Sequence, residues 1–212
     1  MPARLPAERR RRQLLRVALE VFAEKGFHAT SMDDVALAAG VTKPVLYQHF
    51  PSKRALYAEL LEDVERDITG RITAAAARAG SGRERVELGF AAYFDFVAAH
   101  ASAFRLLFGA SVRNDRQFAA IAQRAIDGIA ELVATMIEID VPADHRLALA
   151  HAVVGMAEAT SRRMAGAGVR AGAGATDQAE VEPARLARWL AEMAWFGLRG
   201  VRADEPAGRT TR

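Results

Sequence analysis

The sequence lacks several features that would place the protein in particular classes. It contains no cysteine, which excludes disulfides, thiolate metal sites, iron–sulfur clusters and cysteine nucleophiles, and fits a reducing compartment. No stretch approaches the roughly 18 uncharged apolar residues of a membrane span, and the arginine-rich N-terminus lacks the apolar stretch of a secretory signal. With 212 residues, 51% of them apolar, the chain can form a hydrophobic core. We therefore expect a soluble, cytoplasmic protein that does not enter a membrane.

Proline is scarce and unevenly placed. None of the seven prolines falls between positions 52 and 141, an interval rich in the helix formers Ala, Leu, Arg and Glu. No window alternates apolar and polar residues as a half-buried strand does, and no repeat of fixed period is present. The sequence therefore predicts an all-α fold.

The expected helices are separated by glycine, proline and polar breaks. Gly26 should end the first helix in a left-handed conformation, and Ser31 with Asp34 should open the second as an imperfect capping box. The second helix should stop at Gly40. Apart from this second helix, the predicted helices cover about 7–25, 43–49, 52–78, 84–99, 103–108, 114–139, 143–165 and 183–200. Residues 165–182 are predicted to form a flexible loop, and the tail after Arg202 is predicted to be disordered.

Charge is concentrated near the N-terminus. Residues 1–54 hold ten lysines and arginines against five acidic residues, whereas the rest of the chain holds 19 basic and 21 acidic residues. This asymmetry is typical of a protein whose N-terminal part binds a polyanion, although a solvated basic tail has the same composition. The run Arg9–Arg12 fits either a basic arm that follows DNA or the solvated first turn of a helix.

Two short helices joined by Ala39-Gly40-Val41-Thr42 form a predicted helix-turn-helix. The second of these helices would bury Leu46. Four side chains with polar groups would then face solvent: Lys43, Tyr47, Gln48 and His49. A narrow, donor-rich helical face fits the major groove of DNA, and an ordinary αα-hairpin is the alternative.

Three segments carry a specific resemblance. They are FAEKGFHATSMDDVA at 22–36, AGVT at 39–42 and LYQHFPSK at 46–53, and they resemble the N-terminal domain of TetR-family transcriptional regulators. The match covers roughly residues 10–60 without gaps, and the remainder resembles the family only in the number and length of its helices. The resemblance implies a three-helix helix-turn-helix DNA-binding domain at 1–54 and a helical effector-binding and dimerisation domain at 55–212.

The resemblance also implies which residues contact DNA. Family members contact phosphates near the start of the second helix, here Thr30, Ser31 and Met32, where N–H groups and the helix dipole favour an anion. The third helix enters the major groove, with these candidate contacts: Thr42, Lys43, Val45, Tyr47, Gln48 and His49. Lys53, which opens the fourth helix, would hold another phosphate.

The chemistry of these side chains agrees with that assignment. Gln48 can pair with adenine in a bidentate manner, and Lys43 can reach guanine or a phosphate. The Tyr47 hydroxyl lies far out on a rigid ring and suits a backbone contact. Pro44 lacks a backbone N–H group, which leaves contacts at that position open.

Motifs for catalysis or cofactor binding are weak. The segment from Gly166 to Ala171 matches a dinucleotide-binding pattern, but it follows a predicted helix rather than a strand. The five histidines show no metal-ligand spacing, and no Ser/His/Asp arrangement is evident. We expect no enzyme activity, catalytic residue, cofactor or metal site.

Aromatic residues cluster in one part of the chain, since six of the ten phenylalanines lie between positions 90 and 118. In TetR-like proteins this region surrounds an effector pocket, which predicts an apolar cavity lined by Phe90, Tyr93, Phe94, Phe104, Arg105, Phe108 and Phe118. An ordinary aromatic core is the alternative. The predicted effector is lipophilic, with an anionic group if Arg105 faces inward.

Small residues beside large ones mark two later helices: Ala150, Val154 and Gly155 in one, and Ala194 and Gly197 beside Trp189 and Met193 in the other. In the family such helices form a two-fold dimer interface, and burial within one subunit is the competing explanation. We expect a homodimer in which effector binding shifts the helix at 52–78 and separates the two recognition helices.

The function predicted from the sequence is a ligand-responsive repressor that binds a roughly palindromic operator in double-stranded DNA. The alternative is a helical lipid- or small-molecule-binding protein, or an enzyme, whose basic N-terminus docks on a membrane or another protein. The segment from Thr42 to Lys53 argues against the alternative. A helix that docks on a membrane would show a wide apolar face beside its arginines, which this segment does not.

Overall fold

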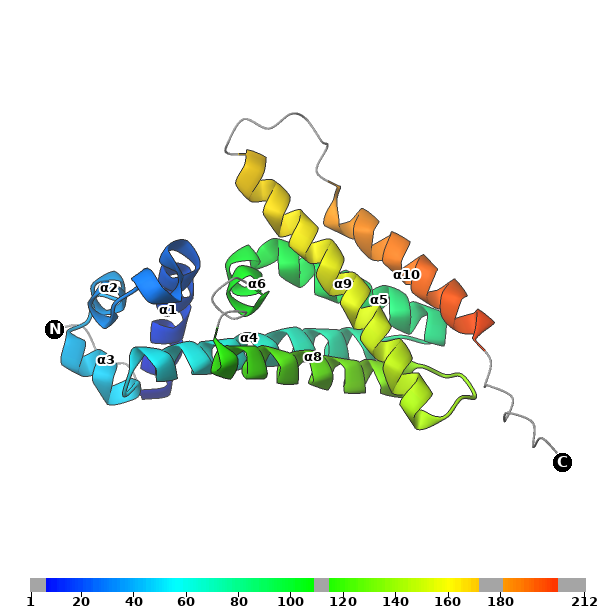
Figure 1. Cartoon of the computed structure of the whole chain (residues 1–212), viewed down its shortest axis with the longest axis horizontal. Helices are drawn as coiled ribbons and strands as arrows, with labels where there is room; N and C mark the ends of the chain where they lie inside the picture. Colours follow the sequence, from blue (N-terminus) through cyan, green and yellow to red (C-terminus); the bar gives the residue numbers. More distant parts are fainter. Residues whose placement is uncertain (1–6, 109–114, 172–180, 202–212) are drawn as a thin grey trace, which may run out of the picture. The chain divides into compact units, whose positions relative to one another are not determined.

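The computed structural model describes residues 7–108, 115–171 and 181–201. The described chain is built from helices and contains no strand (Figure 1). The helices follow the order α1 (Ala7–Ala29), α2 (Met32–Ala38), α3 (Lys43–His49), α4 (Lys53–Ala76), α5 (Gly82–Ala99), α6 (Ala101–Phe108), α8 (Arg116–Met136), α9 (Ala143–Ala171) and α10 (Pro183–Gly200). The all-α prediction is confirmed.

The helix boundaries follow the predicted ones closely, with one clear exception. Helix α9 continues to Ala171, whereas the sequence predicted a loop from residue 165 onward. The additional residues are mostly alanine and glycine, and extending a helix that already exists costs far less than nucleating one. The rest of the predicted loop at 172–180 and the predicted tail at 202–212 lie outside the described residues.

The chain divides into two compact units. The first contains residues 1–68 and 99–125, and the second contains residues 69–98 and 126–212. Helices α4, α5 and α8 each contribute residues to both units.

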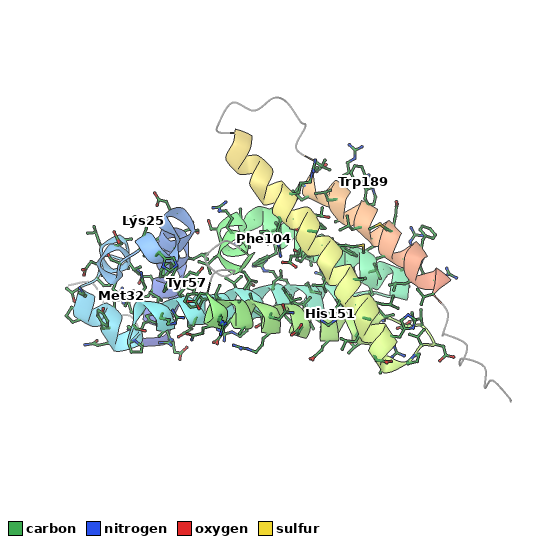
Figure 2. The ribbon with its side chains drawn as sticks, in the orientation of Figure 1. Lys25, Met32, Tyr57, Phe104, His151 and Trp189 are labelled. Carbon is green, nitrogen blue, oxygen red and sulfur yellow. The ribbon has the colours of Figure 1, made fainter. Side chains whose placement is uncertain are left out.

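In the first unit, α1 packs against α2 and α6, and α2 packs against α3. Gly26 interrupts α1 with a φ of 78°, the positive φ predicted at this position. Leu56, Leu60, Val64 and Ile68 in the N-terminal part of α4 are buried, and Tyr57 of this helix lies in an aromatic cluster. Its ring centroid is 5.0 Å from that of Phe27 and 4.6 Å from that of Phe118. The three rings of this cluster are buried in the unit, and Tyr57 is labelled in Figure 2.

The second unit is built on the C-terminal part of α4, most of α5 and α8, and the whole of α9 and α10. Helices α9 and α10 pack against each other, as Figure 1 shows. Phe94 of α5 and Ala150 of α9 are completely buried, and Leu186 and Leu190 of α10 are also buried. The opposite side of α10 carries apolar side chains that remain exposed.

Candidate DNA interface and effector cavity

Short-range contacts determine both ends of α2. The Ser31 hydroxyl accepts a hydrogen bond from the Asp34 N–H at 3.1 Å, while the Ser31 N–H donates to the Asp34 carboxylate at 2.8 Å. The predicted capping box is therefore complete. Lys25 also donates to Asp34 at 2.7 Å, and these bonds hold the pKa of Asp34 well below its usual range. Gly40 has a φ of 63°, which ends α2 in a left-handed conformation.

Helix α3 presents most of its predicted contact residues to solvent. Thr42, Lys43, Tyr47 and Gln48 are exposed, Val45 and His49 are half-buried, and Leu46 is completely buried. Leu46 anchors one side of α3 in the core, so the hydrogen-bond donors and acceptors of the helix lie on its other side. This exposed face is narrow enough to enter a major groove.

Lys43 is the most available cation of this face. Its Nζ donates to the Asp33 carboxylate at 2.9 Å, and this bond raises the pKa of Lys43. Both side chains are well exposed, and exposed ion pairs contribute little stability because water screens them. A phosphate or a guanine edge can therefore replace Asp33 at low energetic cost.

The three residues predicted to contact phosphate at the start of α2 differ in accessibility. The Thr30 side chain is buried and its hydroxyl donates to the Gly26 carbonyl at 2.8 Å. The Met32 side chain is also buried, whereas Ser31 is exposed. Side-chain contact with a phosphate at this point is thus restricted to Ser31.

Lys53 was predicted to hold a phosphate, but in the structure its ammonium group contacts backbone carbonyls of the protein. Its Nζ donates to the backbone carbonyls of Phe27 at 2.8 Å and Thr30 at 2.7 Å. It also lies 4.6 Å from the centroid of the Phe27 ring. Because α1 ends at Ala29, these carbonyls have no N–H donor from a following helical turn, and Lys53 supplies one.

The run Arg9–Arg12 divides into residues with different roles. Arg9 and Arg12 are exposed. Arg11 instead donates to the His49 carbonyl at 2.7 Å and to the Glu59 carboxylate, and its guanidinium lies 4.6 Å from the centroid of the Phe50 ring. The run is therefore not a uniform basic arm, because Arg11 links α1 to the end of α3 and to α4.

The second unit contains a partly open cavity of about 370 Å³, which lies within the usual size range of small-molecule sites. Its walls come from α4, α5, α8, α9 and α10, together with the segment between α8 and α9. Most lining side chains are apolar, including Ile72, Val86, Val133, Val154 and Leu198. An apolar wall of this kind suits a lipophilic molecule.

The predicted lining of the cavity needs revision. Phe90 and Tyr93 line it as predicted, but Phe94 is completely buried and does not. Phe104 and Phe118 are buried in the first unit, and Arg105 is exposed there. The Phe108 side chain lies outside the described residues. The aromatic residues are close in sequence but divide between two units, because the chain passes from one to the other near Ala99 and again near Ala125.

Sequence reasoning missed most of the lining. Ile129, Val133 and Met136 of α8 follow the i, i+4, i+7 spacing of one helical face, a signal that aliphatic periodicity could have provided. Val153 and Ala157 supply the wall from α9. Such stripes look the same whether they line a cavity or a closed core.

Two buried hydroxyls lie near the cavity. Within the part of the chain that the structure describes, the Tyr93 hydroxyl and the Ser161 hydroxyl have no hydrogen-bond partner in acceptable geometry. Burial raises the pKa of Tyr93 above its usual range, and the neighbouring Ser161 hydroxyl partly opposes that rise. Buried polar atoms without partners are costly, so this pair is a local weakness of the core.

The residues that the structure describes contain neither a metal-ligand cluster nor a membrane-spanning helix. No group of three or more histidine, aspartate or glutamate side chains among them is arranged to hold a metal ion. None of their helices has the length and apolar character needed to span a membrane.

Comparison with known protein families matches both parts of the chain. Residues 14–60 match the family model of bacterial regulatory proteins of the tetR family. Residues 83–197, more than half of the chain, match the model of the tetracyclin repressor-like C-terminal domain. The first match contains the helix-turn-helix, and the second contains all but four of the residues that line the cavity.

Individual relatives agree with these matches. The transcriptional activator FasR of Mycolicibacterium smegmatis is 37% identical over 137 residues, which cover 65% of this chain and 63% of FasR. The repressor KstR2 of Rhodococcus jostii is 37% identical over 78 residues, covering 37% of this chain and 38% of KstR2. The matches thus span less than two thirds of the length of these relatives.

Solved structures share the fold over almost the whole chain. A TetR-like transcriptional regulator from Rhodococcus sp. RHA1 is 30% identical with a TM-score of 0.72, and the match covers 93% of this chain and 100% of the other. FadR of Bacillus subtilis, solved with stearoyl-CoA, has the same fold with a TM-score of 0.67 and 14% identity, covering 90% of this chain and 99% of FadR. The helix-turn-helix, the helical unit behind it and both family matches lead to one conclusion: the chain belongs to the TetR family of bacterial transcriptional regulators.

Proposed function

We propose that the chain is a homodimeric repressor that binds a roughly palindromic operator and leaves it when a lipophilic effector occupies the second unit. The observation that carries the DNA-binding part is the exposed face of α3, held in place by the buried Leu46. Base contacts fall to Gln48 and Lys43, and Tyr47 and Thr42 contact the DNA backbone. Ser31 adds a phosphate contact at the start of α2.

An exposed apolar stripe on α10 supports the homodimer. Trp189, Met193 and Phe196 are 42%, 54% and 63% exposed, and they follow the i, i+4, i+7 spacing of one helical face. Trp189 is labelled on α10 in Figure 2. Large apolar side chains gathered on one exposed face mark a protein interface. A second copy of the chain, related by two-fold symmetry, would cover this stripe with its own.

The apolar cavity supports a lipophilic effector. FadR of Bacillus subtilis, a protein of the same fold, was solved with stearoyl-CoA, so this fold can accommodate an acyl chain. A long-chain acyl compound would bury its hydrocarbon against the aliphatic side chains of α5, α8 and α9.

Helix α4 is the proposed link between effector and operator. Its first residue, Lys53, contacts the carbonyls beside the helix-turn-helix, and Ile72 of the same helix lines the cavity. Movement of α4 on effector binding would displace α3 and change its match to the major groove. A coupling of about 1–3 kcal/mol would change operator affinity enough for regulation.

The decisive experiment isolates the operator and then tests its release. Purified protein is incubated with fragmented genomic DNA, and the retained fragments are sequenced and then challenged with long-chain acyl compounds. We expect a small set of fragments with inverted repeats, released by the acyl compounds. Retention of all fragments alike would contradict the operator assignment. Transcription from a retained promoter should fall when protein is added. A rise in transcription would instead show that the protein is an activator and not a repressor.

A further inference from the structure

One end of the cavity is charged. Its charged lining residues are Arg85, Glu138 and Arg199, and the other side chains around it are apolar apart from Tyr93 and Trp195. Arg85 lies in the first turns of α5, Glu138 follows α8, and Arg199 lies in the last turn of α10. Tyr93 lies eight residues beyond Arg85 on α5, which corresponds to roughly 12 Å along the helix. The cavity therefore has a charged end and an apolar interior.

The Arg85–Glu138 ion pair can be exchanged. The Arg85 Nη1 donates to the Glu138 carboxylate at 2.5 Å. The Arg85 side chain is 26% exposed, whereas that of Glu138 is 66% exposed. Glu138 can therefore turn into solvent with little loss, while the more buried guanidinium needs a replacement acceptor. A carboxylate entering from the cavity could accept two parallel hydrogen bonds from it.

The charges around this end favour an anion. Two arginines and a single glutamate are among the lining residues, and the Arg199 guanidinium lies 5.4 Å from the centroid of the Trp195 ring. Stacking uses the flat face of a guanidinium and leaves the N–H groups at its edge for an acceptor. The sequence pointed to Arg105 as the residue for an anionic group, but Arg105 lies exposed in the first unit.

We propose that this charged end binds the anionic head group of an amphipathic effector, with the effector's carboxylate replacing Glu138 as the partner of Arg85. The hydrocarbon tail extends from there toward Tyr93. The inference rests on the proposed function, because it takes the cavity as the effector site. The inference adds the chemical class of the effector to that function. It also names Arg85 as the residue that selects the head group and Glu138 as the carboxylate that competes with the head group.

The test compares two probes with the same tail. Laurate carries a carboxylate and dodecanol a neutral hydroxyl, and their affinities for the full chain are measured by calorimetry. A charge-assisted bidentate contact corresponds to roughly tenfold to a hundredfold in affinity, so laurate should bind more tightly than dodecanol by that factor. Arg85→Met should abolish the difference while leaving dodecanol binding within about twofold.

Two variants separate head-group binding from general effects. Glu138→Gln removes the competing carboxylate and should raise laurate affinity, a gain that misfolding cannot produce. Arg83→Met is the matched control, because Arg83 pairs with Glu87 on the same helix at 2.8 Å and does not line the cavity. Its affinity for both probes should stay within about twofold of the unmodified protein.

The outcomes distinguish this inference from the function on which it rests. Equal binding of laurate and dodecanol, or a laurate affinity unchanged by Glu138→Gln, would overturn the head-group assignment and leave a lipophilic effector in place. Parallel loss of both probes in folded Arg85→Met would also overturn it. Failure of both probes to bind the unmodified protein would overturn the acyl effector and this inference together.

Discussion

The guanidinium of Arg11 donates a hydrogen bond to the backbone carbonyl of His49, at a distance of 2.7 Å. His49 is the last residue of α3, and the same guanidinium bonds the Glu59 carboxylate on α4. Arg11 thus holds the C-terminal end of the recognition helix against the fourth helix. A cation at a helix C-terminus also interacts favourably with the helix dipole.

Replacing Arg11 should therefore change the position of α3 rather than remove a phosphate contact. We expect Arg11→Gln to lower the free energy of unfolding by about 1–3 kcal/mol and to weaken operator binding more than binding to random DNA. The slope of log affinity against log salt should not change, because no counterion contact is lost.

The matched control for Arg11 is its neighbour Arg12, which is exposed on the same helix. Arg12→Gln should leave unfolding unchanged and, if Arg12 contacts phosphate, lower the salt slope by about one. A slope reduced in Arg11→Gln would show that Arg11 contacts DNA directly.

Gln48 and Lys53 should respond differently to substitution. Gln48 is exposed on α3, so Gln48→Ala should cost about 1–3 kcal/mol on the operator and little on random DNA. Lys53 bonds the carbonyls of Phe27 and Thr30, so Lys53→Met should lower the unfolding free energy by about 1–3 kcal/mol. Binding titrations on both DNAs and urea unfolding measure these effects. Unchanged stability of Lys53→Met would argue for a phosphate contact instead.

The buried Tyr93 hydroxyl predicts an unusual result. Tyr93→Phe keeps the ring and removes a polar atom that has no hydrogen-bond partner among the described residues. Because desolvation of that hydroxyl is uncompensated, the variant should be as stable as the unmodified chain or more stable by about 1 kcal/mol. Urea unfolding measures the change. A loss of stability would indicate that the Tyr93 and Ser161 hydroxyls bond each other in solution.

The exposed stripe on α10 predicts the oligomeric state. Phe196→Glu places a charge in the middle of an interface made of apolar side chains, so sedimentation at micromolar concentration should show a monomer. Leu37→Glu is the control, because Leu37 is an exposed apolar residue on α2, away from the stripe. That variant should remain a dimer. Dimers from both variants would remove α10 from the proposed interface.

His151 predicts a pH dependence of stability. The Leu147 carbonyl lies 3.0 Å from one ring nitrogen of His151 and the Asp127 carboxylate 3.3 Å from the other, and both raise the pKa of His151. A histidine whose pKa is raised in the folded state stabilises the fold at pH values below its ordinary pKa of about 6.5. That stabilisation disappears as the pH rises through the folded-state pKa. The melting temperature of His151→Gln should therefore differ most from the unmodified chain at acidic pH. A difference that is constant with pH would exclude this contribution.

Much of the DNA-binding unit follows from short stretches of sequence. The capping box at Ser31, the left-handed Gly40 and the buried Leu46 were all predicted, and the structure contains each of them. Caps, turns and helical faces depend on residues within about two turns of one another, so the local sequence determines them. The outward position of Gln48 and Tyr47 follows directly from the inward position of Leu46.

Only the tertiary structure decided what the charged and aromatic side chains do. Arg11 and Lys53 were indistinguishable in the sequence from other basic residues of a DNA-binding domain, but their partners are 38 and 23 positions away along the chain. Phe90 and Phe118 belonged to one aromatic run, yet one lines the cavity and the other lies in the core of the first unit. A charge or a ring acquires its role from the groups that packing places beside it, and those groups come from distant segments.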